Sequence, residues 1–227
     1  MREIRSLGLG KAAPYRTLDV CQDDVDSRDH RYIPSLALLP EYVDPRVDRG
    51  RIILDQKTEG ACVGFALAAV INASLSRRTR DCAPLAAAKD GIPQRRNRGA
   101  KPGSPKSPVF RPRPEMLASP RMLYEMARRY DDLPGESYEG STLRAAMKGW
   151  HHHGVCSEKI WPYEKGEPGH LDEDRAREAR SRPLGAYCRI ADDDVSHLQA
   201  AIVEADAVLA SAWVHSGWGQ DRLGANG

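Results

Sequence analysis

The sequence predicts an α+β fold in which helices come first and strands gather toward the C-terminal end of the chain. Apolar residues recur at helical spacing over 62–77, and two more helices begin at capping signals near residues 119 and 141. The range 185–214 then has the pattern of a strand, a helix and a second strand. The 227 residues, 41% of them apolar, are enough for one domain with a core or for two lobes around a cleft.

The first predicted helix runs from Cys62 to about Arg77. Its apolar residues follow the three- and four-residue spacing of a buried helix face: Val63, Leu67, Val70, Ile71 and Leu75. Gly64 lies one turn into this helix, where glycine costs about 1 kcal/mol of helix propensity relative to alanine. We therefore expect another backbone to approach the helix closely at Gly64.

The range 78–115 is predicted to be a disordered, basic, proline-rich insertion. It carries a large excess of arginine and lysine over acidic residues and few large apolar side chains, so burial cannot offset the entropy cost of ordering it. Such a charge excess would also suit a tether for an anionic partner such as nucleic acid. Aromatic residues are not interleaved with the basic ones to stack on bases, which favours a mobile surface loop and disfavours nucleic acid as a partner.

The second and third predicted helices have clear start signals. Ser119 is a capping residue followed by Pro120 at the first helical position, and the buried face of this helix is formed by Met122, Leu123, Met126 and Ala127. The third helix follows a Pro-Gly turn, begins at Ser141 and Thr142, and ends at Gly154.

Three consecutive histidines, 151–153, end the third predicted helix, and Cys156 follows them. Neighbouring residues on a helix point about 100° apart, so the three rings cannot converge on one ion without distortion. Histidines in a last helical turn are favoured by the negative end of the helix dipole. The sequence therefore predicts no metal site here, and it implies no cofactor.

The C-terminal part of the chain alternates predicted helices and strands. The range 171–182 is expected to be a charged helix or loop closed by Pro183, and 185–190 is expected to be a strand. Asp194 caps a predicted helix with these residues on one apolar face: Val195, Leu198, Ala201 and Ile202. A buried strand is predicted over 207–214.

The range 55–66 combines a cysteine at a helix start with a glutamine six residues earlier. The N–H groups of a first helical turn and the positive end of the helix dipole both favour ionisation of a thiol such as Cys62. The side chain of Gln56 would be able to donate an amide N–H to an oxyanion that forms on an attacked carbonyl. The pattern predicts a cysteine nucleophile with an oxyanion donor.

This segment resembles the active-site segment of the papain-like cysteine peptidases, Gln-Gly-x-Cys-Gly-Ser-Cys-Trp-Ala-Phe. The matching residues are Gln56, Gly60, Cys62, Phe65 and Ala66. Ala61 is an accepted small residue before the nucleophile. Glu59 stands where secreted members have a disulfide cysteine, and Val63 replaces the aromatic ring that packs beside the thiol.

Later phrases resemble landmarks of the bacterial-type members of this family: Ser-Pro-Arg-Met-Leu-Tyr from 119, Glu-Gly-Ser-Thr-Leu-Arg from 139, and Gly-Val-Cys-Ser-Glu-Lys-Ile-Trp-Pro-Tyr from 154. The resemblance implies a tail over 1–23 and a two-lobe domain over 24–227, with a complete helical lobe and a β-rich second lobe only partly present. It implies hydrolysis of peptide bonds in a peptide or protein substrate through an acyl-enzyme on Cys62. Substrate-binding roles fall to Gly60, Ala61, Gly140 and Ser141.

The resemblance also implies a catalytic histidine about 130 to 150 residues after the cysteine, a window that here holds only His197. His197 lies on a helix expected before the catalytic strand, and the insertion moves the window to about residue 227 or beyond. His215 is the nearest candidate for the base. We expect the family's histidine and asparagine to lie beyond residue 227, and the alternative is a non-catalytic peptide- or protein-binding module that keeps the fold.

Composition and cysteine usage favour the cytoplasm. The N-terminus lacks a continuous apolar stretch of signal-peptide length, and no run of 18 apolar residues predicts a membrane span or a membrane partner. The five cysteines are widely spaced and include no Cys-x-x-Cys pair, so a disulfide scaffold is not expected. The net charge of +2 does not imply a polyanionic partner for the whole chain.

Overall fold

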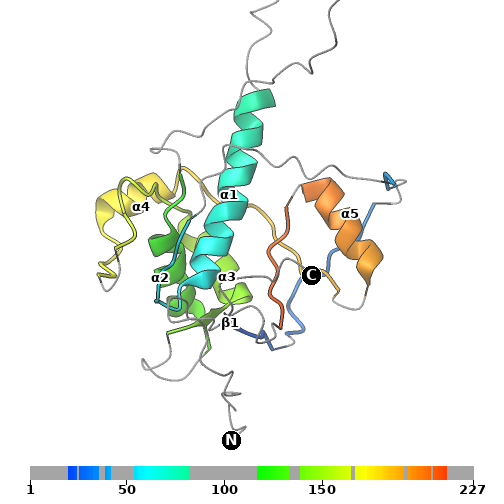
Figure 1. Cartoon of the computed structure of the whole chain (residues 1–227), viewed down its shortest axis with the longest axis horizontal. Coiled ribbons are helices and arrows are strands. Elements are labelled where there is room, and N and C mark those ends of the chain that lie inside the picture. Colours follow the sequence, from blue (N-terminus) through cyan, green and yellow to red (C-terminus); the bar gives the residue numbers. More distant parts are fainter. Residues whose placement is uncertain are drawn as a thin grey trace, which may run out of the picture.

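The computed structural model describes residues 20–24, 26–35, 39–41, 54–81, 117–132, 139–164, 167–191, 194–205 and 207–213. In these ranges the elements are β1 (Val20–Cys21), α1 (Cys62–Asp81), α2 (Pro120–Tyr130), β2 (Ser141–Thr142), α3 (Leu143–His153), α4 (Glu173–Ala179) and α5 (Val195–Ala205) (Figure 1). Helices thus dominate and the strands are short, which agrees with the predicted α+β class at this coarse level.

Helix α1 begins at Cys62 as predicted and is the long central helix in Figure 1. It packs against α2, and α2 packs in turn against α3. A Cβ atom on Gly64 would lie 2.5 Å from the carbonyl oxygen of Pro120 and 2.8 Å from Cβ of Tyr124. The close backbone approach expected at Gly64 is therefore confirmed, and the approaching chain is the first turn of α2.

A second glycine allows the same close packing between α2 and α3. A Cβ atom on Gly149 would lie 2.7 Å from Cβ of Met126. Both contacts bring the helix backbones nearer than ordinary side chains allow. The three helices therefore form one tightly packed group.

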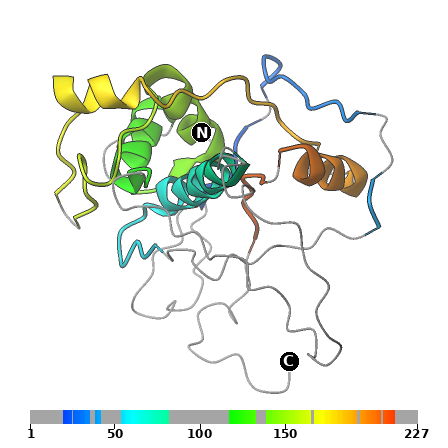
Figure 2. The same cartoon turned by 90° about the horizontal axis from the view of Figure 1, so that it is seen from above.

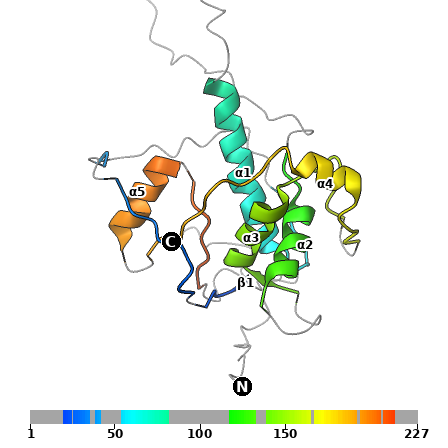
Figure 3. The ribbon, with the colours of Figure 1, turned by 180° about the vertical axis from the view of Figure 1, so that it is seen from behind.

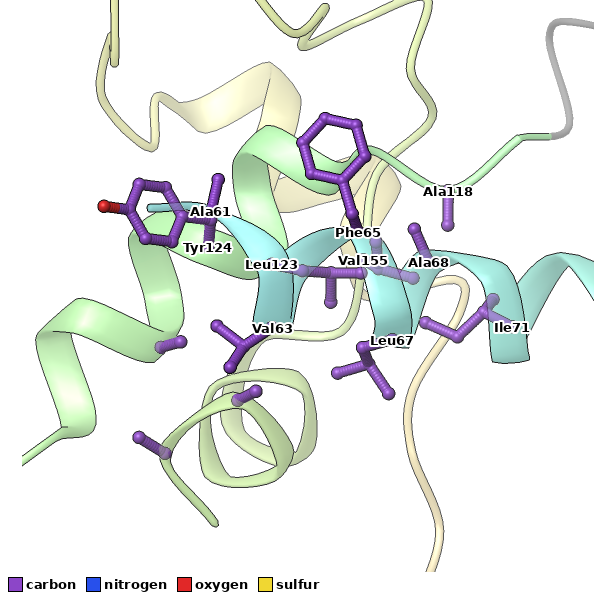
Figure 4. Packing of buried hydrophobic residues seen from close by; sticks show 13 residues of the cluster. Ala61, Val63, Phe65, Leu67, Ala68, Ile71, Ala118, Leu123, Tyr124 and Val155 are labelled. Atoms are coloured by element: carbon purple, nitrogen blue, oxygen red, sulfur yellow. The ribbon is translucent and has the colours of Figure 1, made fainter. Parts of the chain in front are cut away.

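The core of this group surrounds α1. Val63 and Leu67 are almost fully buried, and in Figure 4 they project from one side of α1 while Phe65 projects from another. Ile71 continues the buried face, and Val70 and Leu75 are half-buried. The apolar spacing predicted one buried face, and in the structure α1 is covered on more than one side.

The predicted caps of α2 and α3 are confirmed. The Ser119 hydroxyl accepts a hydrogen bond from the N–H of Met122 at 3.0 Å, and Pro120 is the first residue of α2. The Thr142 hydroxyl accepts from the N–H of Ala145 at 3.1 Å at the start of α3. Gly154 ends α3 with a φ of 75°, a conformation that favours glycine.

Strands β1 and β2 pair in parallel, with Val20 opposite Ser141. The segment after β1 is fastened to α3 by Arg144, whose side chain pairs with Asp29 at 2.6 Å and whose backbone N–H donates to Asp23 at 3.1 Å. Strand β1 lies within the predicted tail 1–23. The boundary between that tail and the domain 24–227 stays a prediction.

The two strands predicted after α4 are wrong for the described residues. The range 185–190 forms no strand, and Arg189 makes only an isolated bridge to Arg31. The range 207–213 has no strand either, and Trp213 is 83% exposed. A strand needs a partner for its N–H and C=O groups, and in the described part of the chain neither segment has a neighbouring strand to supply one.

Helix α5 begins where predicted, because the Asp194 carboxylate accepts from the N–H groups of Ser196 and His197 at 2.9 and 3.2 Å. The predicted apolar face is buried only at Ala201, which lies next to the buried Ala200. Its larger residues are exposed: Val195 at 69%, Leu198 at 38% and Ile202 at 36%. Figures 2 and 3 show α5 on the opposite side of α1 from α4. The alanines carry the packing that the larger side chains were expected to provide.

Most of the predicted insertion lies outside the described residues. Helix α1 continues to Asp81, four residues past its predicted end, so 78–81 are helical and are not part of a loop. The rest of the range 78–115 is not described, and its disorder and its use as a tether stay predictions.

Candidate active site

The candidate nucleophile lies where a tight turn becomes α1. The carbonyl oxygen of Ala61 accepts the N–H groups of Gly64 and Phe65 at 3.0 and 3.2 Å, so the first helical turn closes immediately behind Cys62. The Cys62 side chain is half-buried, between the fully buried Ala61 and Val63. The thiol therefore lies at the edge of the core, at the positive end of a 20-residue helix.

Gln56 is held at both ends. Its side-chain Nε2 donates to the carbonyl oxygen of Glu59 at 3.1 Å, and its backbone oxygen accepts from the hydroxyl of Tyr163 at 2.8 Å. The turn from Gln56 to Glu59 includes Lys57, whose φ of 56° is rare for a residue other than glycine. These contacts fix the orientation of the glutamine amide relative to the turn that leads into Cys62.

Glu59 makes an ion pair at the position where the resemblance places a disulfide cysteine in secreted proteins. Its two carboxylate oxygens accept from the guanidinium of Arg121 at 2.6 and 2.8 Å, and Arg121 is fully buried. Burial raises the pKa of Glu59, but the hydrogen bonds from Arg121 and Tyr163 outweigh it, so this pKa lies below its ordinary value. The carboxylate is thus charged at neutral pH.

Tyr124 links the cysteine helix to the segment that contains Gly140. Its backbone lies against Gly64, and its hydroxyl donates to the carbonyl oxygen of Glu139. Burial raises the pKa of Tyr124 to about 12, so the hydroxyl stays protonated and remains a donor. One buried side chain therefore connects both sides of the predicted site.

The two residues predicted on that far side are both buried. Gly140 precedes β2, and the hydroxyl of Ser141 donates to Asp131 at 3.0 Å. Ser141 as a whole residue is 0% exposed, so neither its side chain nor its backbone is open to a substrate in this structure. The substrate-binding roles of Gly60, Ala61, Gly140 and Ser141 remain predictions.

The predicted base is not among the described residues, because His215 lies outside them. The other histidine weighed for this role, His197, lies on α5, with its Nε2 atom 3.5 Å from the Asp194 carboxylate and its ring edge-on to Tyr32. Helix α5 stands apart from α1 in all three views of the chain. The described structure thus leaves the catalytic base a prediction.

The histidines at the end of α3 pack with aromatic side chains. The Tyr130 hydroxyl lies 2.9 Å from Nε2 of His153, and the ring of His152 stacks on Tyr130. In the described ranges, His, Cys, Asp and Glu side chains form no group of three that could hold a metal ion. Nor does any helix in those ranges have the length and apolar character that crossing a membrane requires.

Sequence reasoning missed Arg121 and Tyr163 as parts of the site. Arg121 follows a cap and a proline and reads as an ordinary charged residue of α2, and Tyr163 reads as part of a packing turn. The one available signal was Glu59, an acidic residue at the position where the resemblance places a disulfide cysteine. A buried carboxylate needs a cationic partner, which is a reason to search for an arginine.

Comparison with solved structures shows a likeness of fold. No family model matches the chain, and a comparison with curated proteins finds no match. Among solved structures the chain is similar to xylellain, a cysteine protease from Xylella fastidiosa, with a TM-score of 0.56 and 24% identity. The match covers 85% of this chain and 63% of xylellain, so the chain spans less than two thirds of that protein. The likeness shows that this chain has a fold similar to that of this cysteine protease.

Proposed function

We propose that this chain is a cysteine peptidase of the papain-like type, with Cys62 as its nucleophile. The observation that carries the proposal is the position of Cys62, which is the first residue of α1, half-buried, and preceded by a turn that fixes Gln56. The fold likeness to a cysteine protease supports it. The proposed setting is a reducing cytoplasm, which would keep the thiol reduced.

The proposed reaction begins with attack of the Cys62 thiolate on the carbonyl carbon of a peptide bond. A sulfur–carbon bond forms, and the carbonyl electron pair moves to oxygen, where the Gln56 amide and the Cys62 backbone N–H stabilise it. The electron pair then returns from oxygen, the carbon–nitrogen bond breaks, and a histidine imidazolium protonates the leaving amine. Water next attacks the thioester carbon and gives a proton to the imidazole, and the sulfur–carbon bond breaks to release the acid and restore the Cys62 thiolate. Within residues 1–227, His215 is the nearest candidate for this histidine.

The proposed substrate is a peptide or protein strand that lies between the Cys62 turn and the segment before β2. Gly140 is the proposed partner for the substrate backbone, and Gly60 and Ala61 are the proposed residues on the opposite side. The buried link through Tyr124 supports this arrangement, because it holds the two segments at a fixed separation.

The test compares two thiols of the same chain. Cys188 is exposed, so its alkylation by iodoacetamide reports an ordinary surface thiol. We expect Cys62 to react at least about tenfold faster than Cys188 at pH 6, because a lowered pKa increases the thiolate fraction. Peptide mapping by mass spectrometry reads the two rates separately. Equal rates at pH 6, or slower reaction of Cys62, would refute the proposal.

The alternative is a module with the same fold that binds peptides without turning them over. The placement of His197 on a helix apart from α1 favours it. This alternative expects binding that survives Cys62→Ala and no hydrolysis by the wild type. Peptide hydrolysis that Cys62→Ala abolishes would rule the alternative out.

A further inference from the structure

We propose that Glu59, Arg121 and Tyr163 are positioning residues, which hold the Gln56 amide where an oxyanion forms. The inference rests on the proposed function and adds to it the group that keeps the oxyanion donor in place. All three residues act through Gln56 and the turn that follows it, and none is proposed to touch the reacting atoms.

Arg121 attaches Glu59, and with it the turn before Cys62, to α2. It lies on α2, and its side chain is fully buried. It binds Glu59 with two parallel hydrogen bonds and also donates to Glu125 at 3.0 Å and to the carbonyl oxygen of Glu164 at 2.6 Å. A bidentate pair restricts the orientation of a carboxylate as well as its distance. The turn is therefore anchored to the body of the helical group.

Tyr163 joins the same anchor to Gln56. Its hydroxyl lies 2.7 Å from a carboxylate oxygen of Glu59 and 2.8 Å from the backbone oxygen of Gln56. The Arg121 guanidinium lies over its ring at 4.5 Å, and Phe65 of α1 packs edge-on against it with the ring centres 4.6 Å apart. One side chain thus contacts the turn, α2 and α1.

The position of the ion pair argues for a geometric role. Replacing a buried ion pair by apolar side chains is often neutral or stabilising, so stability alone is a weak reason for one here. Glu59 is midway between Gln56 and Cys62, three residues from each, and its own carbonyl oxygen accepts the Gln56 amide. Contacts that hold Glu59 in place therefore also hold its carbonyl oxygen, which accepts from the Gln56 side-chain amide and orients it. It also supports the uncommon backbone conformation of Lys57.

The test uses substitutions that keep the charge of the site. Tyr163→Phe removes the hydroxyl and keeps the ring under Arg121, and Arg121→Lys keeps the positive charge but loses the bidentate geometry. Neither substitution changes the charge of the site. A change in aldehyde binding would therefore come from a change in the position of the Gln56 amide. Matched controls are Tyr187→Phe and Arg177→Lys, which alter a half-buried tyrosine beside His151 and an exposed arginine of α4.

The probe is a peptide aldehyde, N-acetyl-phenylalanyl-glycinal, whose binding requires no turnover. The thiol adds to the aldehyde carbon, the carbonyl electron pair moves to oxygen, and that oxygen takes the thiol proton to give a hemithioacetal. The hydroxyl oxygen of the hemithioacetal lies where the oxyanion would form during peptide hydrolysis, so a hydrogen bond from Gln56 stabilises the adduct. We expect Tyr163→Phe and Arg121→Lys each to weaken binding about tenfold or more. The controls should bind as the wild type does.

Two further measurements distinguish a misplaced Gln56 amide from unfolding of the core. Cys156 is fully buried, and burial raises its pKa to about 12, so its alkylation at neutral pH reports opening of the whole core. In both variants Cys156 should stay protected. The double variant Gln56→Ala with Tyr163→Phe should bind the aldehyde no more weakly than Gln56→Ala alone, because Tyr163 acts through Gln56.

The outcomes distinguish this inference from the proposed function. If wild-type Cys62 is no more reactive than Cys188 at pH 6, the proposed function fails and the positioning role falls with it. If Cys62 is reactive but the wild type does not bind the aldehyde, or both variants bind it normally, only the positioning role is overturned. Exposure of Cys156 in the variants also overturns it, because the group would then support the core in general.

Discussion

Gly64 of α1 has no side chain, and it lies where α2 packs against α1. The missing Cβ is what lets the carbonyl oxygen of Pro120 and the backbone of Tyr124 approach within contact distance. The sequence predicted this approach because a glycine inside a helix is costly. The same close contact places the first turn of α1, and with it Cys62, against the helix that carries Arg121.

Gly64→Ala should lower the free energy of unfolding. Alanine gains about 1 kcal/mol of helix propensity, but overpacking against backbone atoms costs roughly 1 to 3 kcal/mol, and contact with Pro120 favours the upper part of that range. We expect a net loss of about 1 to 2 kcal/mol in urea denaturation. Ala66→Gly, at an exposed position of α1, is the matched control and should cost about 1 kcal/mol from propensity alone. Stabilisation by Gly64→Ala would contradict the packing described here.

The residues of the candidate site differ in how far the sequence could predict them. Cys62 and Gln56 were predictable because their relation is local, within one turn and the start of one helix. Arg121 and Tyr163 were not, because they meet Glu59 across 62 and 104 residues of chain. No periodicity links positions so far apart. The packing of α2 against α1 brings Arg121 to Glu59, and the contacts of Tyr163 with Phe65 and Arg121 bring Tyr163 there.

Among the elements, α2 and α3 were predicted with their caps because a capping side chain, a proline and a terminal glycine act within a few residues. The ranges 185–190 and 207–214 have apolar patterns typical of strands, but a strand also requires a neighbour that the pattern does not specify. Short strands form instead at Val20–Cys21 and Ser141–Thr142, where Arg144 and its carboxylate partners hold two segments together.

Asp29→Asn should make stability less dependent on acid pH. Hydrogen bonds from Arg144 lower the pKa of Asp29 in the folded chain, and Arg189 adds to the effect. The folded pKa therefore lies below the unfolded value of about 3.9, and the contribution is full above that value and is lost as the pH falls through the folded pKa. At pH 7 the variant should be less stable by about 1 kcal/mol, and the two proteins should converge toward pH 2.

Urea denaturation at pH values from 7 to 2 measures this difference. The control is Asp174→Asn on α4, whose carboxylate is largely exposed and pairs only with the exposed Arg177 among the residues described. Its stability should follow that of the wild type at every pH. A constant gap between Asp29→Asn and the wild type over the whole range would contradict the role of the Asp29 charge.

For the whole molecule, the helical group around α1 followed from the sequence more closely than the C-terminal part did. The α+β class followed from the sequence because helix periodicity and caps are local. The exposed apolar face of α5 and the unpaired range 207–213 did not, since burial depends on what packs against a segment rather than on its own pattern. The two-lobe arrangement and the base remain proposals.

The pH profile of Cys62 alkylation shows whether this thiol is an activated nucleophile. Iodoacetamide rates at Cys62, mapped by mass spectrometry between pH 4 and 9, report the pKa of the thiol at the start of α1 without requiring turnover. We expect a midpoint between about 4 and 7, well below the ordinary thiol pKa of about 8.5. A midpoint at or above that ordinary value would contradict Cys62 as an activated nucleophile, and with it the proposed peptidase function.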